Sequence, residues 1–391
     1  MVLLAWLGIF FLGESMRSKS DSPILLVMAG GTGGHIFPGL AVADMLKQQG
    51  WQIHWLGTAD KMEANLVPEH GYDISFINIS GLRNKGLLSW LKLPFKLVAS
   101  LWQGIQVIKT IKPDVVLGMG GYASAPGGLA AWLMKKPLVV HEQNAAAGLT
   151  NRLLSRIANK VCCAFPDAFE TKIDAQVVGN PLRASIGEHA QKNADISKEV
   201  TAKTSNNILV IGGSLGAQVL NQIIPPSFAE LVKRQAEQPA FNIWHQTGKD
   251  KQVEVVDAYN QHHFANEQVR VTEFIKDMAS AYQWADIVIC RAGALTVSEL
   301  AMAAKPAIFV PLPHAVDDHQ TKNAQYLVAR GAATLIKQHE LTSESLAKTL
   351  QDLFSEKQIL NIMAQAAFAA ADVNATSKVA QICQQLIPTG K

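Results

Sequence analysis

The chain carries ILLVMAGGTGGH at residues 24–35, and this stretch predicts how the domain around it is built. The apolar run Ile24–Ala29 predicts a buried strand, the four glycines a loop, and the apolar pattern from about Pro38 a helix that ends at Gly50. Glycines without a Cβ let the backbone approach a ligand closely, and a helix N-terminus supplies free N–H groups that suit a phosphate. The spacing matches neither GxGxxG nor the P-loop, so a dinucleotide site and an NTPase site both fail in detail.

The same order of elements returns in ILVIGGSLGAQ at residues 208–218, where a strand over 208–211 leads through a glycine loop into a helix over 217–224. Short apolar runs alternate with helical patterns along both halves, which is typical of a parallel sheet buried on both faces. Further strands are predicted at 52–56, 115–118, 138–141, 161–164, 242–245, 269–272, 286–290 and 307–310. We expect an α/β fold of two Rossmann-like, doubly wound domains that face each other across a cleft and bind ligands at the carboxyl ends of the strands.

A polar stretch, EHAQKNADISKEVTAKTSNN at residues 188–207, lacks strong periodicity and marks the boundary between the two halves. We therefore expect an N-terminal domain over 23–180, a linker over 181–206 and a C-terminal domain over 207–370. Residues 371–391 form a predicted C-terminal helix that could pack back on the N-terminal domain.

The first 22 residues are predicted to lie outside the fold. Residues 2–12, VLLAWLGIFFL, are an apolar run of 11 residues, whereas a helix that spans a bilayer needs about 20. No Lys or Arg precedes the run, so a secretory signal is a poor fit. Three interpretations stay open: a start codon assigned too early, with Met16 available, an interfacial anchor, or a short helix packed on the fold. We favour the first.

Composition excludes several classes of protein. The chain has 391 residues, and 35 Lys and Arg against 32 Asp and Glu leave a net charge of +3, which argues against a dedicated nucleic-acid binder. The four cysteines, Cys162, Cys163, Cys290 and Cys383, fit neither a disulfide framework nor a zinc site. The sequence contains no DxD triplet, and neither a metal nor a cofactor is expected.

The segment CRAGALTVSELAMAAKPAIFVPLPHAVDDHQTKNA at 290–324 is the richest in polar groups near predicted strand ends. Thr296 and Ser298 fall in the first turn of a predicted helix over 295–304, where free N–H groups can meet phosphate. Glu299 lies one turn in and could bind a vicinal diol such as ribose, or it could be an ordinary solvated residue. A polar cluster follows, made of His314, Asp317, Asp318, His319 and Gln320. We expect a helix cap from Asp318 and sugar contacts from His319 and Gln320 rather than a metal site.

Taken together, these segments resemble the GT-B glycosyltransferases, and within them the N-acetylglucosaminyltransferases of bacterial peptidoglycan synthesis, the MurG family. The resemblance runs from about Ile24 to the C-terminus. It rests on seven ordered motifs: GGTGGH (30–35), LGMGGYASAPG (117–127), HEQN (141–144), GNPLR (179–183), GGSLGA (212–217), RAGALTVSE (291–299) and DDHQTKNA (317–324).

The resemblance implies inverting transfer of GlcNAc from UDP-GlcNAc to the C4 hydroxyl of MurNAc in undecaprenyl-diphospho-MurNAc-pentapeptide (lipid I), which yields lipid II. It places the nucleotide sugar mainly on the C-terminal domain and the acceptor on the N-terminal domain, with Ile275 meeting uracil through its backbone and Glu299 meeting the ribose. The implied donor-site residues are Thr32, Gly33, Gly34, Asn144, Arg183, Ser214, Ile275, Ala294, Leu295, Thr296, Val297, Ser298, Glu299 and Gln320.

Inverting transfer needs a base for the attacking hydroxyl and stabilisation of the departing UDP. Because the chain has no DxD triplet, metal-dependent transfer of the GT-A type is disfavoured. Helix N-termini, backbone amides and hydroxyls would then meet the charge of the leaving group. His35 is the implied catalytic residue, since an imidazole titrates near neutrality, or else it binds the acceptor. Glu142 is a second base candidate or a buried structural group. Two alternatives from other classes are an epimerase of the same fold that acts on UDP-GlcNAc, and a nucleotide-binding or dehydrogenase protein, which would call for the missing GxGxxG.

No acidic residue occurs between Asp73 and Asp114, where cations mix with aromatic residues. This pattern suits adsorption onto anionic lipid, although a core helix with a basic outer face would also produce it. The predicted membrane patch comprises Lys85, Trp90, Lys92, Phe95, Lys96 and Trp102. We expect a peripheral protein on the cytoplasmic face of the bacterial inner membrane. Expected partners are UDP-GlcNAc, the lipid-linked acceptor, anionic membrane and proteins of cell-wall synthesis or division, but no nucleic acid.

Overall fold

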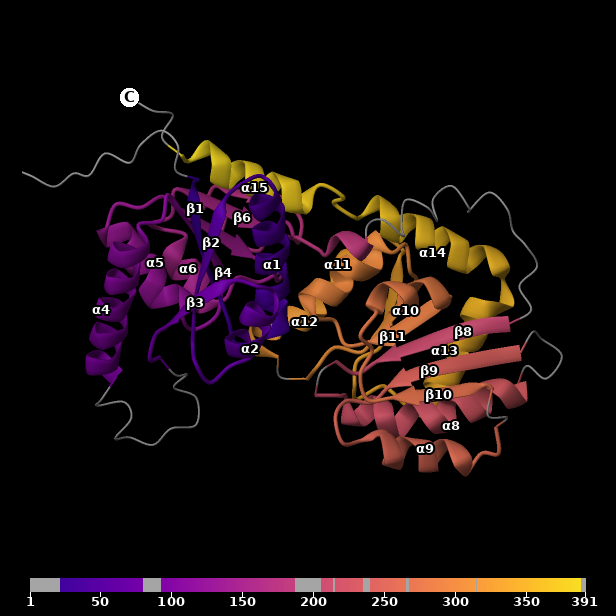
Figure 1. Ribbon diagram of the computed structural model, residues 1–391. Coiled ribbons are helices and arrows are strands. Elements are labelled where there is room, and N and C mark those ends of the chain that lie inside the picture. Colours follow the sequence, from indigo (N-terminus) through magenta and orange to yellow (C-terminus); the bar gives the residue numbers. More distant parts are fainter. Residues whose placement is uncertain are drawn as a thin grey trace, which may run out of the picture.

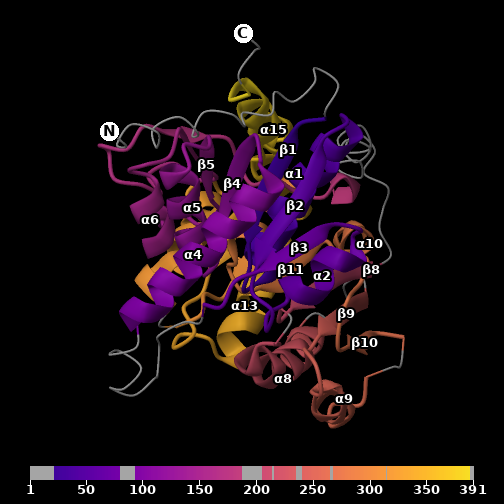
Figure 2. The ribbon, with the colours of Figure 1, turned by 60° about the vertical axis from the view of Figure 1, so that its left-hand side comes forward.

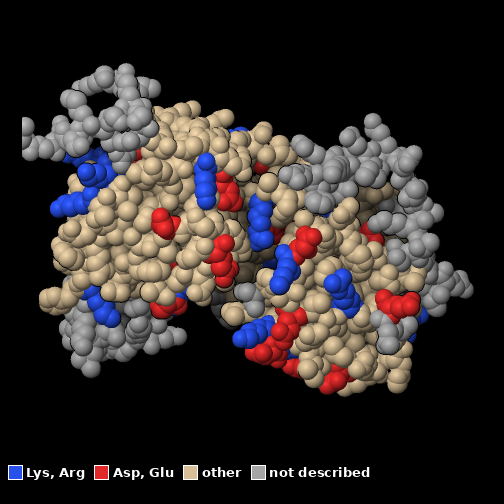
Figure 3. Space-filling model, in the orientation of Figure 1, with Lys and Arg blue, Asp and Glu red and all other residues tan. Residues whose placement is uncertain are grey.

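The computed structural model describes residues 22–79, 93–186, 205–213, 215–234, 240–264, 267–313 and 315–387. These residues form two α/β domains, each built on its own parallel sheet (Figure 1). Figure 3 shows the surface hollowed between the two domains. The extension before residue 22 lies outside the described residues, so its three interpretations stay open.

The N-terminal sheet has the strand order β3-β2-β1-β4-β5-β6-β7, and its neighbouring strands all pair in parallel. The order reverses between β1 and β4, and in open α/β sheets such a switch point leaves a crevice at the carboxyl ends of the strands. The strands are β1 (Ile24–Ala29), β2 (Gln52–Gly57), β3 (Asp73–Phe76), β4 (Val115–Gly120), β5 (Leu138–Glu142), β6 (Lys160–Cys163) and β7 (Ala175–Val177).

Helices cover both faces of this sheet. Figure 2 shows α4, α5 and α6 together on one side, where Ile108, Ala130 and Leu154 join one apolar core with β1 and β4. The other face packs against α1 and α2. The described helices of this domain are α1 (Gly33–Gln48), α2 (Glu63–Glu69), α4 (Leu93–Ile111), α5 (Ser124–Leu133) and α6 (Leu149–Leu154).

The helix α1 begins at Gly33, so the predicted start near Pro38 is wrong. Extended backbone at Thr32 opens the helix directly after the glycine loop, and Pro38 lies inside it. The predicted end is confirmed: Gly50 has φ +87°, its N–H donates to the Lys47 carbonyl, and the Trp51 N–H donates to the Leu46 carbonyl. This Schellman motif satisfies the last carbonyls of α1.

The C-terminal sheet is also parallel and has the order β10-β9-β8-β11-β12-β13, with its switch point between β8 and β11. Its strands are β8 (Ser205–Ile211), β9 (Ala240–Gln246), β10 (Val269–Thr272), β11 (Ile287–Cys290), β12 (Ala307–Phe309) and β13 (Ala333–Leu335). Its helical elements are α8 (Gln218–Arg234), α9 (Gln252–Asn260), α10 (Met278–Trp284), α11 (Ala294–Met302), the 3-10 turn η1 (Val316–Asp318), α12 (His319–Val328), α13 (Ser343–Ser355) and α14 (Lys357–Ala369). The predicted pair of doubly wound parallel domains is confirmed.

The chain crosses back to the N-terminal domain after α14 (Figure 1). Its last described helix, α15 (Ala375–Gln385), packs on α1, and Val379 and Cys383 share an apolar core with Leu46. The domain bounds named above as 23–180, 181–206 and 207–370 stay predictions, and most of the linker lies outside the described residues.

Candidate functional site

The glycine loop after β1 is held by a buried carboxylate. Glu63, which is fully buried at the start of α2, accepts hydrogen bonds from Gly31 N at 2.9 Å, Thr58 N at 3.0 Å and Thr58 Oγ1 at 2.7 Å. Thr32 is exposed and caps α1 with no side-chain hydrogen bond, so the first turn beside Gly33 and Gly34 presents its backbone at the crevice. Glu63 has no place in any motif, and the sequence offered no signal for it.

A second glycine loop, at the end of β4, lies against the first. Gly120 and Gly121 have φ of +99° and +92°. A Cβ on Gly121 would lie 2.5 Å from the Gly30 carbonyl oxygen, and one on Gly120 would lie 2.9 Å from His35 Nδ1. Only glycine allows this approach, which brings β4 against the imidazole of His35.

His35 contacts the HEQN motif (141–144), which begins at the end of β5, at the same edge of the sheet. Its Nδ1 lies 2.8 Å from Gln143 Oε1, and Gln143 Nε2 lies 3.1 Å from Nδ1 of His141. His141 is fully buried, and this burial lowers the pKa of its imidazole to about 4. The structure therefore brings the GGTGGH and HEQN motifs together, 108 residues apart in the chain.

Both carboxylate oxygens of Glu142 accept hydrogen bonds. One carboxylate oxygen accepts from the backbone N–H of Asn144 at 2.9 Å and from its side chain at 3.0 Å, and the other accepts from Gly148 N at 3.1 Å and Asn151 Nδ2 at 2.8 Å. Only 2% of the residue is exposed. This arrangement favours the structural alternative for Glu142, in which it orients Asn144 and the following loop, over the role of base.

In the C-terminal domain the GGSLGA loop is shaped by Gln246. Its Oε1 accepts from Gly212 N and Gly213 N, both at 3.0 Å, and its Nε2 donates to the Gly213 carbonyl at 3.0 Å. Gly216 has φ +70°, and a Cβ there would lie 2.0 Å from the Thr247 carbonyl oxygen, so the turn requires glycine. Ser214, predicted as a donor contact, lies outside the described residues.

The helix α11 carries six consecutive predicted donor residues, Ala294 to Glu299, on its first turns. Its N-cap, Gly293, makes no side-chain cap, and the buried Ala294 and Val297 can meet a ligand only through their backbone. Leu295, Thr296 and Ser298 are half-buried. The helix N-terminus and its free amides suit an anionic group in the cleft.

Glu299 is half-buried on the same helix and accepts a 2.8 Å hydrogen bond from the Tyr282 hydroxyl. Burial raises the pKa of its carboxyl above the ordinary range, while the Tyr282 hydrogen bond and the Arg183 guanidinium act in the opposite direction. An ordinary solvated helix residue would not be held in this way. Arg183 also stacks on the Phe37 ring of α1, with its guanidinium carbon 4.0 Å from the ring centre.

Hydrogen bonds tie the two domains together beside these groups. Asn323 of α12 is fully buried; its Oδ1 accepts from Ala145 N at 2.7 Å, and its Nδ2 donates to Asn144 Oδ1 at 3.3 Å. Asn180 Nδ2 donates to Ser298 Oγ at 2.9 Å. Sequence reasoning named neither Asn323 nor Asn180 as a site residue, although both lie in the quoted motifs.

Two further predicted contacts lie near the edge of the C-terminal sheet. Gln320 Oε1 accepts from Leu312 N at 2.9 Å, so this side chain orients the loop after β12. Ile275 is buried, which leaves its backbone as the part that can face a ligand.

The predicted helix cap from Asp318 is wrong. Asp318 occupies the N-cap position of α12 but makes no side-chain cap, because the backbone is left-handed there, with φ 51°, and the carboxylate accepts from Thr321 Oγ1 at 2.7 Å instead. Asp317 forms an ion pair across the domains with Arg152 at 3.6 Å. Among the described residues, which omit His314, no group of three or more His, Cys, Asp or Glu side chains could hold a metal ion.

The GT-B class is defined by two doubly wound parallel domains, each with a glycine loop at the carboxyl ends of its strands. In this chain the C-terminal domain also presents the N-terminus of α11 at that edge, where a nucleotide sugar can bind. Comparisons with known proteins agree. The model of the glycosyltransferase family 28 N-terminal domain matches residues 25–163, and that of the glycosyltransferase family 28 C-terminal domain matches residues 207–386.

Two curated relatives, from Colwellia psychrerythraea and Aeromonas hydrophila, bear the name UDP-N-acetylglucosamine--N-acetylmuramyl-(pentapeptide) pyrophosphoryl-undecaprenol N-acetylglucosamine transferase. The first is 66% identical over 94% of this chain and 94% of its own length, and the second 54% over 93% and 97%. The crystal structure of Acinetobacter baumannii MurG has a TM-score of 0.79 and 41% identity over 93% of this chain and 99% of that one.

The chain belongs to glycosyltransferase family 28 and, within it, to the MurG family, which confirms the resemblance seen in the motifs. A UDP-GlcNAc 2-epimerase from Neisseria meningitidis bound to UDP-GlcNAc has a TM-score of 0.63 but only 15% identity over 93% of this chain and 100% of that one, so it shares the fold alone.

Proposed function

We propose that this chain transfers GlcNAc from UDP-GlcNAc to the C4 hydroxyl of MurNAc in undecaprenyl-diphospho-MurNAc-pentapeptide, with inversion at the anomeric carbon. The observation that carries the proposal is the 66% identity, over 94% of both chains, to a relative named for this transfer. An epimerase is not favoured, because the UDP-GlcNAc 2-epimerase from Neisseria meningitidis matches in fold at only 15% identity.

The donor lies on the C-terminal domain in this proposal. The N-terminus of α11 faces the diphosphate, where preorganised dipoles stabilise the negative charge that develops on departing UDP. The Glu299 carboxylate binds the ribose hydroxyls, and Tyr282 holds that carboxylate in place. Arg183 is close enough to influence Glu299 and lies beside α1, so it can join the donor site when the domains bind ligand.

The base is His35 in this proposal. Its imidazole lies at the carboxyl edge of the N-terminal sheet between the glycine loops and Gln143. Glu142 is less suited to this task, because four hydrogen bonds already occupy its carboxylate. Thr32, Gly33, Gly34 and Asn144 line the same edge and are the proposed contacts to the GlcNAc.

The acceptor is lipid-linked, so the N-terminal domain must approach a membrane. Large apolar side chains are exposed along three neighbouring helices of this domain, with Phe95 79% and Trp102 61% exposed. They are Phe95, Val98 and Trp102 of α4, Trp132 and Leu133 of α5, and Leu149 and Leu153 of α6. We call these residues the apolar face; the exposed Arg156 lies just after α6, and the exposed Lys135 follows α5.

An exposed apolar face next to cations fits adsorption on anionic lipid. We therefore place the enzyme on the cytoplasmic face of the inner membrane, with lipid as a partner. Lys85, Trp90 and Lys92 of the predicted patch lie outside the described residues, whereas Phe95, Lys96 and Trp102 lie on α4. Within the part of the chain that the structure describes, no helix is long and apolar enough to cross a bilayer.

One assay tests the proposed reaction. The purified full chain is incubated with labelled UDP-GlcNAc, with and without lipid-linked MurNAc-pentapeptide. We expect UDP release that requires the acceptor, and label in the lipid product. Scrambling of label to the C2 epimer without acceptor would support the epimerase instead, and acceptor-independent hydrolysis alone would contradict transfer.

A further inference from the structure

A chain of hydrogen bonds joins the His35 imidazole to the backbone carbonyl of Gly179 through two buried side chains, those of Gln143 and His141. Gln143 is 1% exposed and His141 0%. The contacts run from His35 Nδ1 to Gln143 Oε1 at 2.8 Å, from Gln143 Nε2 to His141 Nδ1 at 3.1 Å, and from His141 Nε2 to the Gly179 oxygen at 2.9 Å. The direction of each bond follows from its neighbours.

The direction is set first at Gly179. A carbonyl oxygen can only accept, so His141 Nε2 carries a proton and donates it. Burial keeps the pKa of His141 at about 4, so near neutral pH the ring is uncharged and carries that one proton only. Its Nδ1 is therefore an acceptor.

Gln143 transmits this choice to His35. Its Nε2 lies within hydrogen-bonding distance of two acceptors on His141, the ring Nδ1 at 3.1 Å and the backbone oxygen at 3.2 Å. The amide nitrogen must face His141, and so the amide oxygen faces His35. Because an amide oxygen only accepts, His35 Nδ1 carries the proton.

We infer that Gln143 and His141 are positioning residues that hold neutral His35 as its Nδ1–H tautomer and so leave the lone pair on Nε2 to take the acceptor's proton. This inference rests on the proposed transfer reaction. In that step the MurNAc hydroxyl gives its proton to His35 Nε2, its oxygen forms a bond to C1 of GlcNAc, and the C1–O bond to the diphosphate breaks. UDP leaves with that electron pair, and the imidazolium later returns the Nε2 proton to solvent.

Neighbouring residues hold the hydrogen-bonded chain of His35, Gln143, His141 and Gly179 in place. Asn180 Nδ2 donates to the backbone oxygen of Gln143 at 3.1 Å, and Gly120 packs directly on the His35 ring. Gly179, whose φ is +80°, is packed so closely that a Cβ there would lie 2.6 Å from Asp372 Cβ. Because Gln143 and His141 are buried, neither side chain can replace its hydrogen-bond partner with bulk water.

The test is ¹⁵N-histidine NMR on the full chain, with the His35 signals assigned from a His35→Asn sample, combined with steady-state kinetics. We expect wild-type His35 to be protonated on Nδ1 and bare on Nε2. In Gln143→Met, which removes both the donor and the acceptor, the Nδ1–H preference should disappear and kcat should fall at least tenfold, with KM for UDP-GlcNAc within twofold. The matched control is Gln338→Met, which makes the same exchange at a partly buried amide that accepts a hydrogen bond from Arg291. It should change neither the His35 tautomer nor kcat.

Gln143→Glu keeps the side-chain volume and an oxygen facing His35, so it should retain the Nδ1–H signal and more kcat than Gln143→Met. It also serves if Gln143→Met does not fold. A wild-type His35 protonated on Nε2, or a Gln143→Met enzyme with unchanged tautomer or unchanged kcat, would overturn the inference. A wild-type enzyme that fails to transfer GlcNAc contradicts the proposed function instead, and the NMR signal of His35 distinguishes the two cases.

Discussion

His245 lies fully buried on β9, within a second network that takes no part in the proposed chemistry. Its Nε2 lies 3.2 Å from Asn221 Oδ1, and the Tyr259 hydroxyl lies 3.0 Å from its Nδ1. Burial lowers the pKa of His245 to about 3. Because its pKa is lower in the folded chain than in the unfolded one, the unfolded chain takes up the proton first as pH falls.

The stabilisation from uncharged His245 is therefore complete above pH ~6.5 and is lost progressively below it. Between pH 7.5 and 5, we expect His245 alone to remove about 2 kcal/mol from the free energy of unfolding. His245→Gln should show a loss smaller by that amount, measured by urea unfolding at each pH. The exposed His262, replaced by Gln, is the control; an equal loss in His245→Gln and wild type would refute the assignment.

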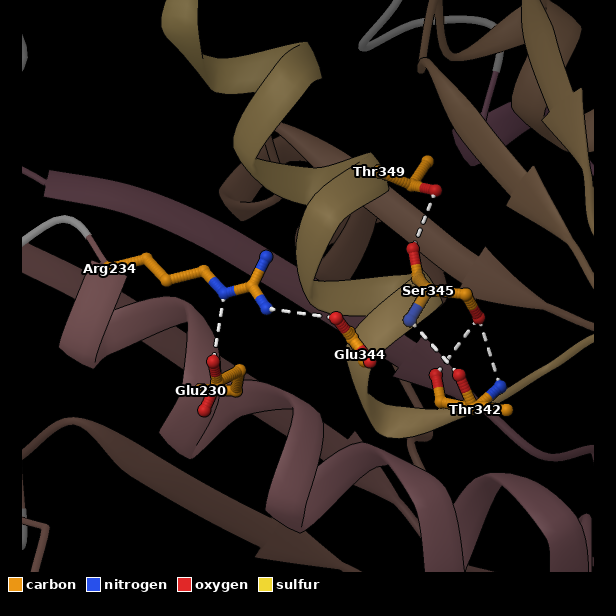
Figure 4. A network of polar contacts seen from close by, with 6 residues as sticks. All are labelled: Glu230, Arg234, Thr342, Glu344, Ser345 and Thr349. Carbon is orange, nitrogen blue, oxygen red and sulfur yellow. Dashed lines mark hydrogen bonds and ion pairs between the residues drawn. The ribbon is translucent and has the colours of Figure 1, made fainter.

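Among the elements, α13 shows how local chemistry starts a helix. Thr342 Oγ1 accepts from Ser345 N at 3.1 Å, and Ser345 Oγ accepts from Thr342 N at 2.9 Å, which completes a capping box (Figure 4). Arg234 of α8 contacts both Glu230, at 2.9 Å, and Glu344 of α13, at 4.0 Å. These ion pairs are largely solvent-accessible, so the cap contributes more to the helix start than they do.

Thr342→Ala should lower the free energy of unfolding by about 1 kcal/mol, because the backbone N–H of Ser345 loses the Thr342 hydroxyl that accepts its hydrogen bond. Chemical denaturation of the full chain measures this change. Thr349→Ala is the control: its hydroxyl donates to the Ser345 carbonyl inside the same helix, and Ala is a good helix former. A loss at Thr349 as large as that at Thr342 would contradict the role of the cap.

The strands that sequence patterns missed share one property. The edge strands β3, β7 and β13 are only partly buried and lack a continuous apolar run, so no pattern marked them.

The helix α8 runs on to Arg234 rather than ending at Ile224, although Pro225 and Pro226 follow there. Phe228 and Leu231 beyond the prolines are buried in the core, and this burial outweighs the lost backbone hydrogen bonds.

At the scale of the whole molecule, the apolar face lies entirely on the N-terminal domain, while the donor-site helix α11 belongs to the other one. Membrane binding and nucleotide-sugar binding should therefore respond to different substitutions. A change at the apolar face should alter membrane binding without changing how the C-terminal domain holds the nucleotide sugar.

Phe95→Ser combined with Trp102→Ser should weaken binding to vesicles containing phosphatidylglycerol at least tenfold, since each side chain would otherwise leave water for lipid. Co-sedimentation measures the binding, and calorimetry with UDP-GlcNAc should show unchanged affinity. Val253→Ser with Ile362→Ser removes two equally exposed apolar side chains from the C-terminal domain and should leave vesicle binding intact. Unchanged vesicle binding by the α4 variant would exclude this face.

The pair of doubly wound sheets and the family can be predicted from local patterns in the sequence, because each apolar run or glycine motif is complete within about a dozen residues. The sequence also marked His35 and Glu299, whose motifs are continuous. The partners that hold these groups become visible in the folded chain: Gln143 contacts His35 from 108 residues away, Asn323 contacts Ala145 from 178, and Glu63 accepts a hydrogen bond from a loop residue 32 positions earlier. Such pairings depend on where the sheets bring distant strand ends together, and no spacing along the chain encodes that distance.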